Sequence, residues 1–458
     1  MFPVDDKFKE ECAIVGVIGT PEAANYCYLG LYAMQHRGHE GSGIVASNGT
    51  DLIAVKDTGV VADIFDEETL KTLPGQIAIG HNRYATFGSK DRANLQPFVA
   101  NLGTGPISIA HNGNLVNADE LRKSLEADGA IFATTSDTEV FLHLIAHSDA
   151  KWSLLKRIEH ACKQVKGAYS LVLCSQDKLY GLRDPYGVRP LSLARLGKGY
   201  VLASETCAFD LLGAKFERDI KPGEIVECAL DGGLHASETL VQKEQAFCVF
   251  EYIYFARPDS VIDGRHVYDV RKKLGAELAR ESHTDADIVI PVPDSGVPAS
   301  IGYSQATKLP MEFGLIRNHY VGRTFIEPQQ SIRDFGVKVK LNPNADLLRG
   351  KRVIVVDDSI VRGTTSKKIV TMLRAAGAKE VHMRISSPQT VSPCHYGIDT
   401  PSKNELIAAT HKLEDICKFI GADTVQYLSI EGMYRAVKGE QSKFCDACFT
   451  TNYRLGII

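Results

Sequence analysis

The stretch Val353–Val370, VIVVDDSIVRGTTSKKIV, places two adjacent acids directly after four β-branched aliphatic residues. Such an aliphatic run is typical of a strand that is buried on both faces, as in a parallel sheet. A glycine and three hydroxyl residues, Gly363–Ser366, follow the acids and lead into a helical pattern that Gly377 closes. The stretch therefore predicts a strand, a loop and a helix. The apolar face of the predicted helix consists of Ile369, Val370, Met372, Leu373 and Ala376.

The loop of this unit predicts a phosphorylated ribose as its ligand. In such units ligands bind at the carboxyl end of the strand, where loop N–H groups and the helix N-terminus attract anions. The glycine and hydroxyl end suits a phosphate, whereas Asp357 and Asp358 would repel a phosphate and suit ribose hydroxyls or Mg²⁺. Neither a Walker A loop nor a GxGxxG pattern is present. The alternative is a solvated acid pair at a strand end, followed by ordinary helix capping.

Length, composition and charge narrow the class of protein. A chain of 458 residues can form two or three domains, and 44% hydrophobic with 24% charged residues is typical of a soluble globular protein. The net charge of −4 gives no general attraction to nucleic acid or anionic membranes. No apolar run reaches the ~20 residues that span a bilayer, and the first eleven residues are too charged for a secretory signal. We expect a cytoplasmic protein that binds neither nucleic acid nor membrane.

The pattern of predicted strands and helices changes along the chain. From Cys12 to about Leu240, short β-branched runs alternate with turn residues, and helices are expected near Glu120–Ala127 and Glu139–Ala146. A polar junction is expected at Leu234–Gln245. From Ala286 onward strands and helices alternate, which predicts a doubly wound parallel sheet.

Cys12 begins an aliphatic run, where a lone cysteine is usually a packed strand residue. Four later segments place polar groups in loops or at strand ends: QHRGHEGSGI at 35–44, HNRYATFG at 81–88, AHNGNL at 110–115 and TSDTE at 135–139. In this order after a cysteine, they resemble the glutamine amidotransferases whose nucleophile is an N-terminal cysteine. That family makes ammonia from glutamine within an αββα sandwich.

This resemblance implies a role for five residues. Cys12 would attack the side-chain amide of glutamine, and Asn112 with the backbone of Gly113 would form the oxyanion hole. Arg83 and Asp137 would hold the carboxylate and the amino group of the substrate.

The resemblance also implies that the chain is processed. The base in that family is the α-amino group of the cysteine itself, whose reference pKa of ~7.7–8.0 suits proton transfer near neutral pH. Eleven residues precede Cys12, so its nitrogen is an amide in the sequence as written. We therefore expect residues 1–11 to be a cleaved propeptide.

The run Val353–Thr365 resembles the 5-phosphoribosyl 1-pyrophosphate signature of the type I phosphoribosyltransferases. The resemblance implies that Asp357 and Asp358 bind the ribose hydroxyls and, through Mg²⁺, the pyrophosphate. The loop that holds the 5-phosphate would contribute Ser359, Arg362, Gly363, Thr364 and Thr365.

Two other segments would complete this second site. PVPDSGVPAS at 291–300 would supply a pyrophosphate loop, with Ser295 near the metal. The irregular segment Gly322–Asn342 would be a lid, with Arg323 and Lys338 among its cations.

The eleven cysteines are an odd number in a chain expected in the cytoplasm, which argues against a disulfide framework. Cys445 and Cys448 form a CxxC, and adding Cys248 and Cys394 gives four thiols, enough for Zn²⁺ or an iron–sulfur cluster. Spacing cannot choose between these two. Six others read as small buried hydrophobic residues: Cys27, Cys162, Cys174, Cys207, Cys228 and Cys417.

With DPYGVRPL at 184–191 and FEYIYFARPDS at 250–260, nearly the whole chain resembles the glutamine phosphoribosylpyrophosphate amidotransferases. The four thiols match the branch that carries a 4Fe–4S cluster and a propeptide. The implied organisation is an N-terminal-nucleophile αββα domain at 12–245, then a type I phosphoribosyltransferase domain at 246–458. The cluster-binding tail would belong to this second domain, and the fold class would be α+β followed by α/β.

The family resemblance implies a two-step enzyme that begins purine synthesis. Ammonia from glutamine would displace pyrophosphate from 5-phosphoribosyl 1-pyrophosphate, giving 5-phosphoribosylamine and glutamate. Purine nucleotides would be feedback inhibitors, and the protein would be a homo-oligomer, either a dimer or a tetramer. One alternative is a glutaminase joined to a sugar isomerase domain, against which the acid-pair signature argues. Another is a ribose-phosphate-binding regulator without catalysis, which the five glutaminase residues disfavour.

Overall fold

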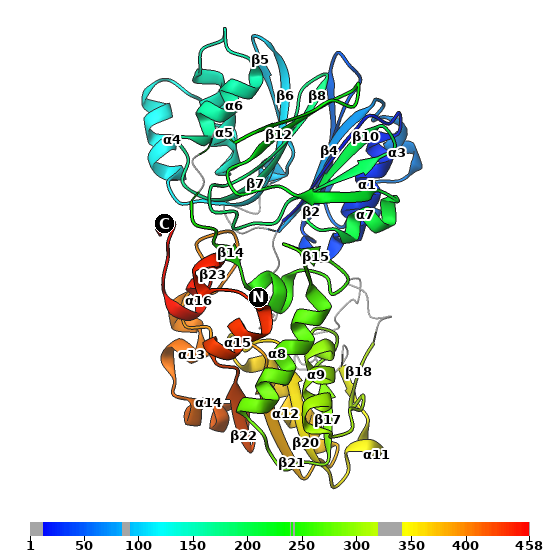
Figure 1. The fold of residues 1–458 in the computed structure, drawn as a ribbon, viewed down its shortest axis with the longest axis vertical. Helices are drawn as coiled ribbons and strands as arrows, with labels where there is room; N and C mark the ends of the chain where they lie inside the picture. The colour runs from blue at the N-terminus through cyan, green and yellow to red at the C-terminus, as the bar shows by residue number, and fades with distance from the viewer. Residues whose placement is uncertain (1–11, 85–91, 239, 241–242, 319–340, 458) are drawn as a thin grey trace, which may run out of the picture.

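The protein has two halves stacked along its long axis, as the computed structural model shows (Figure 1). The structure describes residues 12–84, 92–238, 240, 243–318 and 341–457. The N-terminal half extends through β13, and the C-terminal half begins with β14.

The N-terminal half contains two antiparallel sheets. Among the described residues their orders are β11-β9-β10-β1-β4-β2-β3 and β13-β12-β8-β7-β6-β5. The first sheet comprises β1 (Ala13–Ile18), β2 (Gly41–Ser47), β3 (Leu52–Thr58), β4 (Ile77–Arg83), β9 (Ser192–Leu196), β10 (Gly199–Ala203) and β11 (Lys215–Asp219). The second comprises β5 (Phe98–Leu102), β6 (Gly105–Leu115), β7 (Gly167–Cys174), β8 (Lys178–Arg183), β12 (Ile225–Ala229) and β13 (Leu234–Ser237).

Alternation along the strands explains why these sheets stack. On β1, Ile14 and Ile18 pack between the sheets, whereas Val15 and Val17 face helices. Gly16 shares the inner face, and a Cβ there would lie 2.6 Å from Val172 Cγ1, so the missing side chain lets the sheets approach closely. The helices over the first sheet are α1 (Ala23–Ala33), α2 (Val61–Ile64), α3 (Glu67–Lys71) and α7 (Cys207–Leu212). Those over the second are α4 (Ala118–Ala127), α5 (Thr138–His147) and α6 (Leu154–Cys162).

The resulting four layers confirm the predicted αββα sandwich. The short β-branched runs expected from Cys12 to about Leu240 include the strands β1, β2, β3, β4, β6, β7, β8 and β10, and the two expected helices are α4 and α5. The start of the expected junction, Leu234–Ser237, is instead the edge strand β13.

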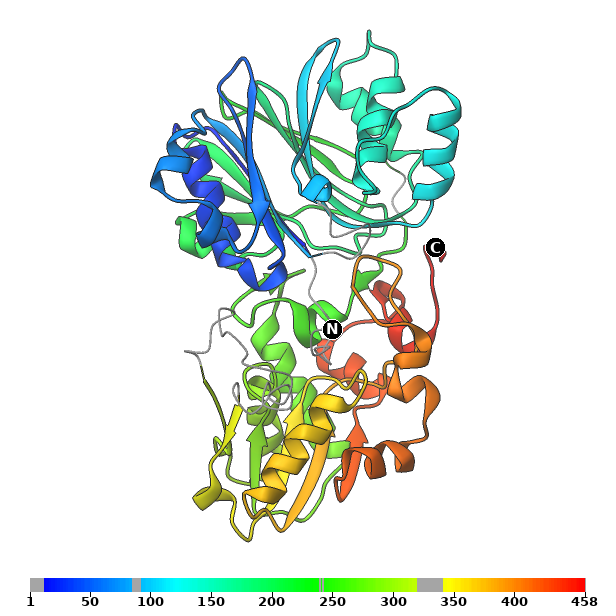
Figure 2. The same ribbon diagram turned by 180° about the vertical axis from the view of Figure 1, so that it is seen from behind.

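The C-terminal half is built on a parallel sheet of order β17-β20-β21-β22. Ile354 and Val356 of β20 pack towards α8 and α9, while Val353 and Val355 pack towards α12 and α14. Figure 1 shows α8 and α9 over one face, and α12, yellow in Figure 2, lies over the other. The sheet is therefore doubly wound, as predicted. Its elements are β17 (Ile288–Pro291), β20 (Arg352–Asp357), β21 (Glu380–Ile385), β22 (Thr424–Tyr427), α8 (Val267–Glu281), α9 (Val297–Thr307), α12 (Thr364–Ala375) and α14 (Leu413–Ile420).

Smaller elements connect and surround this sheet. The strand pairs are β14 (Phe247–Cys248) with β23 (Phe444–Cys445), β15 (Val261–Ile262) with β16 (Arg265–His266), and β18 (Leu315–Arg317) with β19 (Leu341–Pro343). The short helices are α11 (Ala345–Leu348), α13 (Ile407–Thr410), α15 (Ile430–Val437) and α16 (Ala447–Thr450). The single turns are η1 (Gln35–Arg37), η2 (Arg92–Asn94), η3 (Glu251–Phe255), η5 (Lys403–Glu405) and η6 (Gln441–Lys443).

The C-terminal tail returns to the boundary between the halves. β14 pairs in parallel with β23, which places Cys248 beside Cys445. Farther along, Gly456 lies near Val116 of the N-terminal half. In Figure 2 the red tail runs up from the lower half to this boundary. The tail therefore contacts both halves.

Two further expectations concern the buried cysteines and membrane-spanning segments. Five of the six cysteines expected in the core are buried, and Cys417 is half-buried. Within the described ranges, no helix is both long and apolar enough to cross a membrane.

Candidate functional site

Cys12 lies immediately before β1, partly exposed, and its Sγ donates to the carbonyl oxygen of Tyr84 at 3.4 Å. Burial raises the pKa of the Cys12 thiol, while the positive charges of Arg83 and Arg37 oppose that rise. A thiol with a raised pKa is mostly protonated near neutral pH, so it needs a base to react. The expected propeptide, residues 1–11, lies outside the described part of the chain.

The predicted oxyanion residues lie at the end of β6. Asn112 is fully buried, and neither polar atom of its side chain has a hydrogen-bond partner among the described residues. Leaving such a group unsatisfied costs about 1–3 kcal/mol, so a partner from a ligand is expected there. Gly113 has φ +146°, a conformation that residues with side chains rarely adopt. Both features suit a site that receives the substrate's carbonyl oxygen.

Asp137 and Arg83 are buried near the same thiol, because both charges influence the pKa of Cys12. Asp137 accepts from the backbone N–H of Leu115 at 2.9 Å, and its Oδ1 lies 3.6 Å from His111 Nδ1. Burial raises the pKa of Asp137, but His111 and the hydrogen bonds outweigh burial and lower it. Asp137 is therefore held as a carboxylate. Arg83 and Asp137 thus lie close to Cys12, and Asp137 is bonded to β6 two residues beyond Gly113.

Arg37 is a site residue that the sequence reasoning missed. Its Nε donates to the carbonyl oxygen of Cys12 at 3.2 Å, and its guanidinium pairs with Glu205 at 2.6 Å and with Glu251 at 2.8 Å. Arg189 also pairs with Glu251, at 2.8 Å. Because Glu251 belongs to the C-terminal half, this buried network joins the nucleophile's backbone to both halves.

The acid pair at the end of β20 is buried, each residue being 1% exposed. The backbone N–H of Asp358 donates to Asp357 Oδ1 at 2.9 Å, and Ser359 Oγ donates to Asp358 Oδ1 at 2.6 Å. Burial lowers the pKa of the Arg271 guanidinium to about 10, and the charge of Asp358 opposes that lowering. Arg271 was not predicted, and it supplies a buried cation near the pair. This burial excludes the alternative of a solvated strand end.

The loop after the acid pair leads directly into α12. Gly363 has φ +79° immediately before the helix, and Thr364 and Thr365 form the start of its first turn. A helix N-terminus reached through a glycine is a ready anion-binding site. Arg362 donates to Glu405 at 2.9 Å.

The segment Pro291–Ser300 lies beside the acid pair. β17 ends at Pro291, and a Cβ on Gly296 would lie 2.4 Å from the carbonyl oxygen of Val356, so the loop that carries Ser295 packs against the end of β20. The expected lid lies mostly outside the described residues, which include neither Arg323 nor Lys338. Its last residues, Leu341 and Asn342, belong to β19.

Four cysteines from distant segments meet near the junction. Cys248 and Cys445 are neighbours across the β14–β23 pair. The carbonyl oxygen of Cys448 accepts from Val391 at 2.9 Å, three residues before Cys394. Burial raises the pKa of all four thiols, that of Cys248 to about 11, and the other thiols raise those of Cys445 and Cys448 further. Within the described ranges, no three His, Cys, Asp or Glu side chains form a group that could hold a metal ion.

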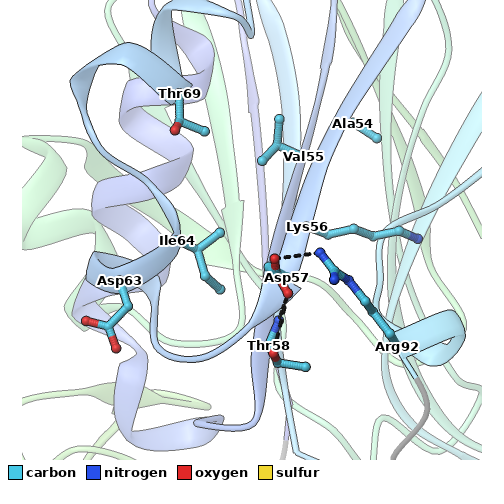
Figure 3. A pocket seen from close by; sticks show the side chains of 9 residues that line it. All are labelled: Ala54, Val55, Lys56, Asp57, Thr58, Asp63, Ile64, Thr69 and Arg92. Carbon is cyan, nitrogen blue, oxygen red and sulfur yellow. Dashed lines mark hydrogen bonds and ion pairs between the residues drawn. The ribbon is translucent and has the colours of Figure 1, made fainter.

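A separate hollow of about 460 Å³ lies along the edge strand β3 (Figure 3). An ion pair between Arg92 and Asp57, 2.6 Å long, lies on one side of it. The described residues that line it include none of the predicted site residues, so it belongs to neither site. Its lining residues are Ala54, Val55, Lys56, Asp57, Thr58, Asp63, Ile64, Thr69 and Arg92.

Comparison with known proteins assigns a family to each half. Residues 81–210 match the glutamine amidotransferase domain, and residues 263–386 match the phosphoribosyl transferase domain. Amidophosphoribosyltransferase 1 of Arabidopsis thaliana, named as chloroplastic, is 52% identical over 98% of this chain and 79% of its own length. The amidophosphoribosyltransferase of Bacillus subtilis is 48% identical over 97% of this chain and 94% of its own length.

Solved structures agree over the full length. One is the glutamine phosphoribosylpyrophosphate amidotransferase of B. subtilis complexed with ADP and GMP; it has a TM-score of 0.92 and 47% identity, covering 98% of both chains. Another, described as the allosteric regulatory enzyme of purine biosynthesis, has a TM-score of 0.93 and 47% identity, covering 98% of this chain and 97% of that one. Because both domains match and the relatives match over nearly the whole chain, this chain belongs to the amidophosphoribosyltransferase family.

Proposed function

We propose that this chain hydrolyses glutamine at Cys12 and uses the ammonia to displace pyrophosphate from 5-phosphoribosyl 1-pyrophosphate at the acid pair. The products are glutamate, pyrophosphate and 5-phosphoribosylamine, and the reaction is the first committed step of purine synthesis. The observation that carries the proposal is the buried amide of Asn112, which has no partner among the described residues and lies on β6, the strand whose Leu115 is bonded to Asp137 beside Cys12.

In the first site, the Cys12 sulfur attacks the carbon of the glutamine side-chain amide, and its proton passes to the free α-amino group. The negative charge that develops on the amide oxygen is stabilised by hydrogen bonds from Asn112 Nδ2 and the Gly113 backbone. Arg83 holds the substrate's α-carboxylate, and Asp137 accepts hydrogen bonds from its amino group. The α-ammonium returns the proton to the leaving nitrogen, ammonia departs, and water then hydrolyses the thioester to glutamate.

In the second site, Asp357 and Asp358 bind the ribose hydroxyls, and the loop from Ser359 to Thr365 binds the 5-phosphate. Both carboxylates and the nearby Ser295 hydroxyl are hard oxygen donors, so they fit Mg²⁺. When bound, Mg²⁺ would offset the negative charge of the departing pyrophosphate. Ammonia attacks C1 of the ribose as the bond to pyrophosphate breaks. A closed passage between the two sites, with Arg323 and Lys338 of the lid over the second, would keep ammonia from leaking.

The first test of this function compares the rates of its two half-reactions in the unmodified protein. With glutamine, 5-phosphoribosyl 1-pyrophosphate and Mg²⁺ present, glutamate and pyrophosphate should appear at equal rates. A rate of pyrophosphate release that does not depend on either glutamine or ammonia would contradict the proposal.

Maturation at Cys12 is a separate prediction. The mature chain should begin at Cys12, because an amide nitrogen cannot accept the thiol proton. Intact-mass spectrometry of active protein should therefore show the loss of residues 1–11. Full-length chains with Met1 retained and full glutamine-dependent activity would rule this out.

We also propose that Cys248, Cys394, Cys445 and Cys448 hold a 4Fe–4S cluster with a structural role. The support is the donor set: Cys248 is buried, the other three thiols are half-buried, and the four lie close enough to influence one another's pKa. Four cysteine thiolates are the usual ligands of such a cluster. The four cysteines come from three distant segments. A shared cluster would therefore link the C-terminal tail to the start of the C-terminal half and restrict the unfolded chain.

Loss of this group should unfold the protein. Air should bleach a brown preparation and remove activity and cooperative thermal unfolding together, as followed by absorbance, iron and sulfide analysis and circular dichroism. Cys448→Ser should lack iron, whereas Cys417→Ser, outside the set, should keep it. Colourless protein with one zinc and no iron, fully active in air, would refute the cluster.

The remaining predictions concern regulation, assembly and location. Feedback inhibition by purine nucleotides is supported by the ADP and GMP bound to the B. subtilis relative. Assembly as a homodimer or homotetramer and a cytoplasmic location remain proposals.

A further inference from the structure

A loop of the C-terminal half touches the backbone of the predicted oxyanion hole. We call 394–400 the bracing loop. A Cβ on its Gly397 would lie 2.8 Å from Gly113 Cα, 2.9 Å from its carbonyl carbon and 3.1 Å from its carbonyl oxygen. One residue along β6, Asn114 Nδ2 donates to the carbonyl oxygen of His395 at 3.1 Å. The two backbones therefore meet with no side chain between them.

Gly113 is confined from its other side as well. A Cβ there would lie 2.1 Å from the carbonyl oxygen of Ala168 on β7. Two residues later, the N–H of Leu115 is bound to Asp137, a predicted glutamine ligand. The end of β6 is thus held between β7 and Gly397, and its position affects both the oxyanion hole and the carboxylate that receives the substrate.

The bracing loop itself is firmly attached. The backbone N–H of Cys394 donates to Thr400 Oγ1 at 2.7 Å, which closes the loop at its base. The hydroxyl of Tyr396 donates to the carbonyl oxygen of Gly456 at 2.9 Å and accepts from the N–H of Leu455 at 3.0 Å. Gly397 itself has φ +104° and is buried. The loop therefore presents a fixed backbone, tied to the C-terminal tail, to the end of β6.

We propose that Gly397 is a positioning residue for glutamine hydrolysis: from the phosphoribosyltransferase half, it fixes the backbone of Gly113 where the amide oxygen becomes negatively charged. This inference rests on the proposed function. Oxyanion donors act only when they are already in place, and losing one costs about 10²–10³ in kcat. Glutamine hydrolysis therefore depends on how the tail and the bracing loop pack, although neither touches glutamine.

The test is Gly397→Ala, whose added methyl group must displace Gly113. The kcat for glutamine-dependent synthesis should fall about 10-fold or more, with the KM for glutamine near that of the parent, because the oxyanion contact strengthens only in the transition state. Ammonia-dependent synthesis should stay within about twofold, since it bypasses the first site. Alkylation of Cys12 by iodoacetamide, followed by mass spectrometry, should keep its rate, because that reaction forms no oxyanion.

Gly421→Ala is the matched control. Gly421 also has a positive φ, +80°, but a Cβ there meets no described atom within 4 Å, so this variant adds the same kind of backbone strain without the contact. It should keep all three rates.

A second variant keeps the inference testable if Gly397→Ala does not fold. Asn114→Ala removes the hydrogen bond to His395 without adding atoms, and it should lower the glutamine-dependent kcat selectively, by a smaller factor. Unchanged glutamine-dependent rates in the folded variants would overturn the inference. So would a parallel loss of ammonia-dependent synthesis and Cys12 alkylation, which would indicate general damage. Absence of ammonia-dependent synthesis in the parent protein would instead count against the proposed function.

Discussion

Replacing Cys12 with alanine should lower glutamine-dependent synthesis by at least about 1000-fold, because removal of a nucleophile that acts with its base eliminates the covalent route. Ammonia-dependent synthesis should persist at close to the parent rate, since the acid-pair site does not use the thiol. The measurement is pyrophosphate release at saturating glutamine and, separately, at saturating ammonium. Cys417→Ala, which removes another partly exposed thiol, should leave both rates unchanged. Equal loss of both activities in Cys12→Ala would argue against two separable sites.

Neutralising either member of the acid pair should have the complementary effect. In Asp357→Asn and Asp358→Asn the rate should fall with both nitrogen sources, because the substrate they share loses a charged partner. Loss of one such hydrogen bond costs about 1.5–3 kcal/mol, or roughly 10- to 150-fold.

The control for this pair lies at the opposite end of the sheet. Asp287 immediately precedes β17 and pairs with Arg352 at 2.9 Å. Asp287→Asn therefore removes a carboxylate and an ion pair from the same domain, away from the site, and its rates should stay near the parent's. Unchanged ammonia-dependent synthesis in both acid-pair variants would reduce the pair to a structural feature.

Local patterns predicted the parts of the fold that neighbouring residues determine. The aliphatic run Val353–Val356 requires burial on both faces, and Gly363 allows the turn into α12, so this unit was correct in full. Short alternating runs likewise predicted the sandwich strands. The prediction of a junction beginning at Leu234 was wrong at its start, because an exposed edge strand such as β13 is polar, like a linker.

Contacts between distant segments were beyond such patterns. Arg37 meets Glu251 across 214 residues, and no periodicity relates the two. A buried arginine needs acidic partners, but the sequence does not show which acids the fold brings to it. The contact between Gly397 and Gly113 is of the same kind, because a glycine in the sequence does not show which distant backbone will pack against it. Motifs predicted the site residues themselves, whereas the residues that support them required the structure.

The central claim is that the amide nitrogen of glutamine, released at Cys12, becomes the amino group on C1 of the ribose. The unmodified protein can be given glutamine labelled with ¹⁵N in its side-chain amide, together with 5-phosphoribosyl 1-pyrophosphate, Mg²⁺ and unlabelled ammonium. Mass spectrometry of the captured phosphoribosylamine should show mainly ¹⁵N, with one glutamate formed for each labelled product. Labelled glutamine that yields glutamate while the product carries only unlabelled nitrogen, or no product at all, would contradict the account.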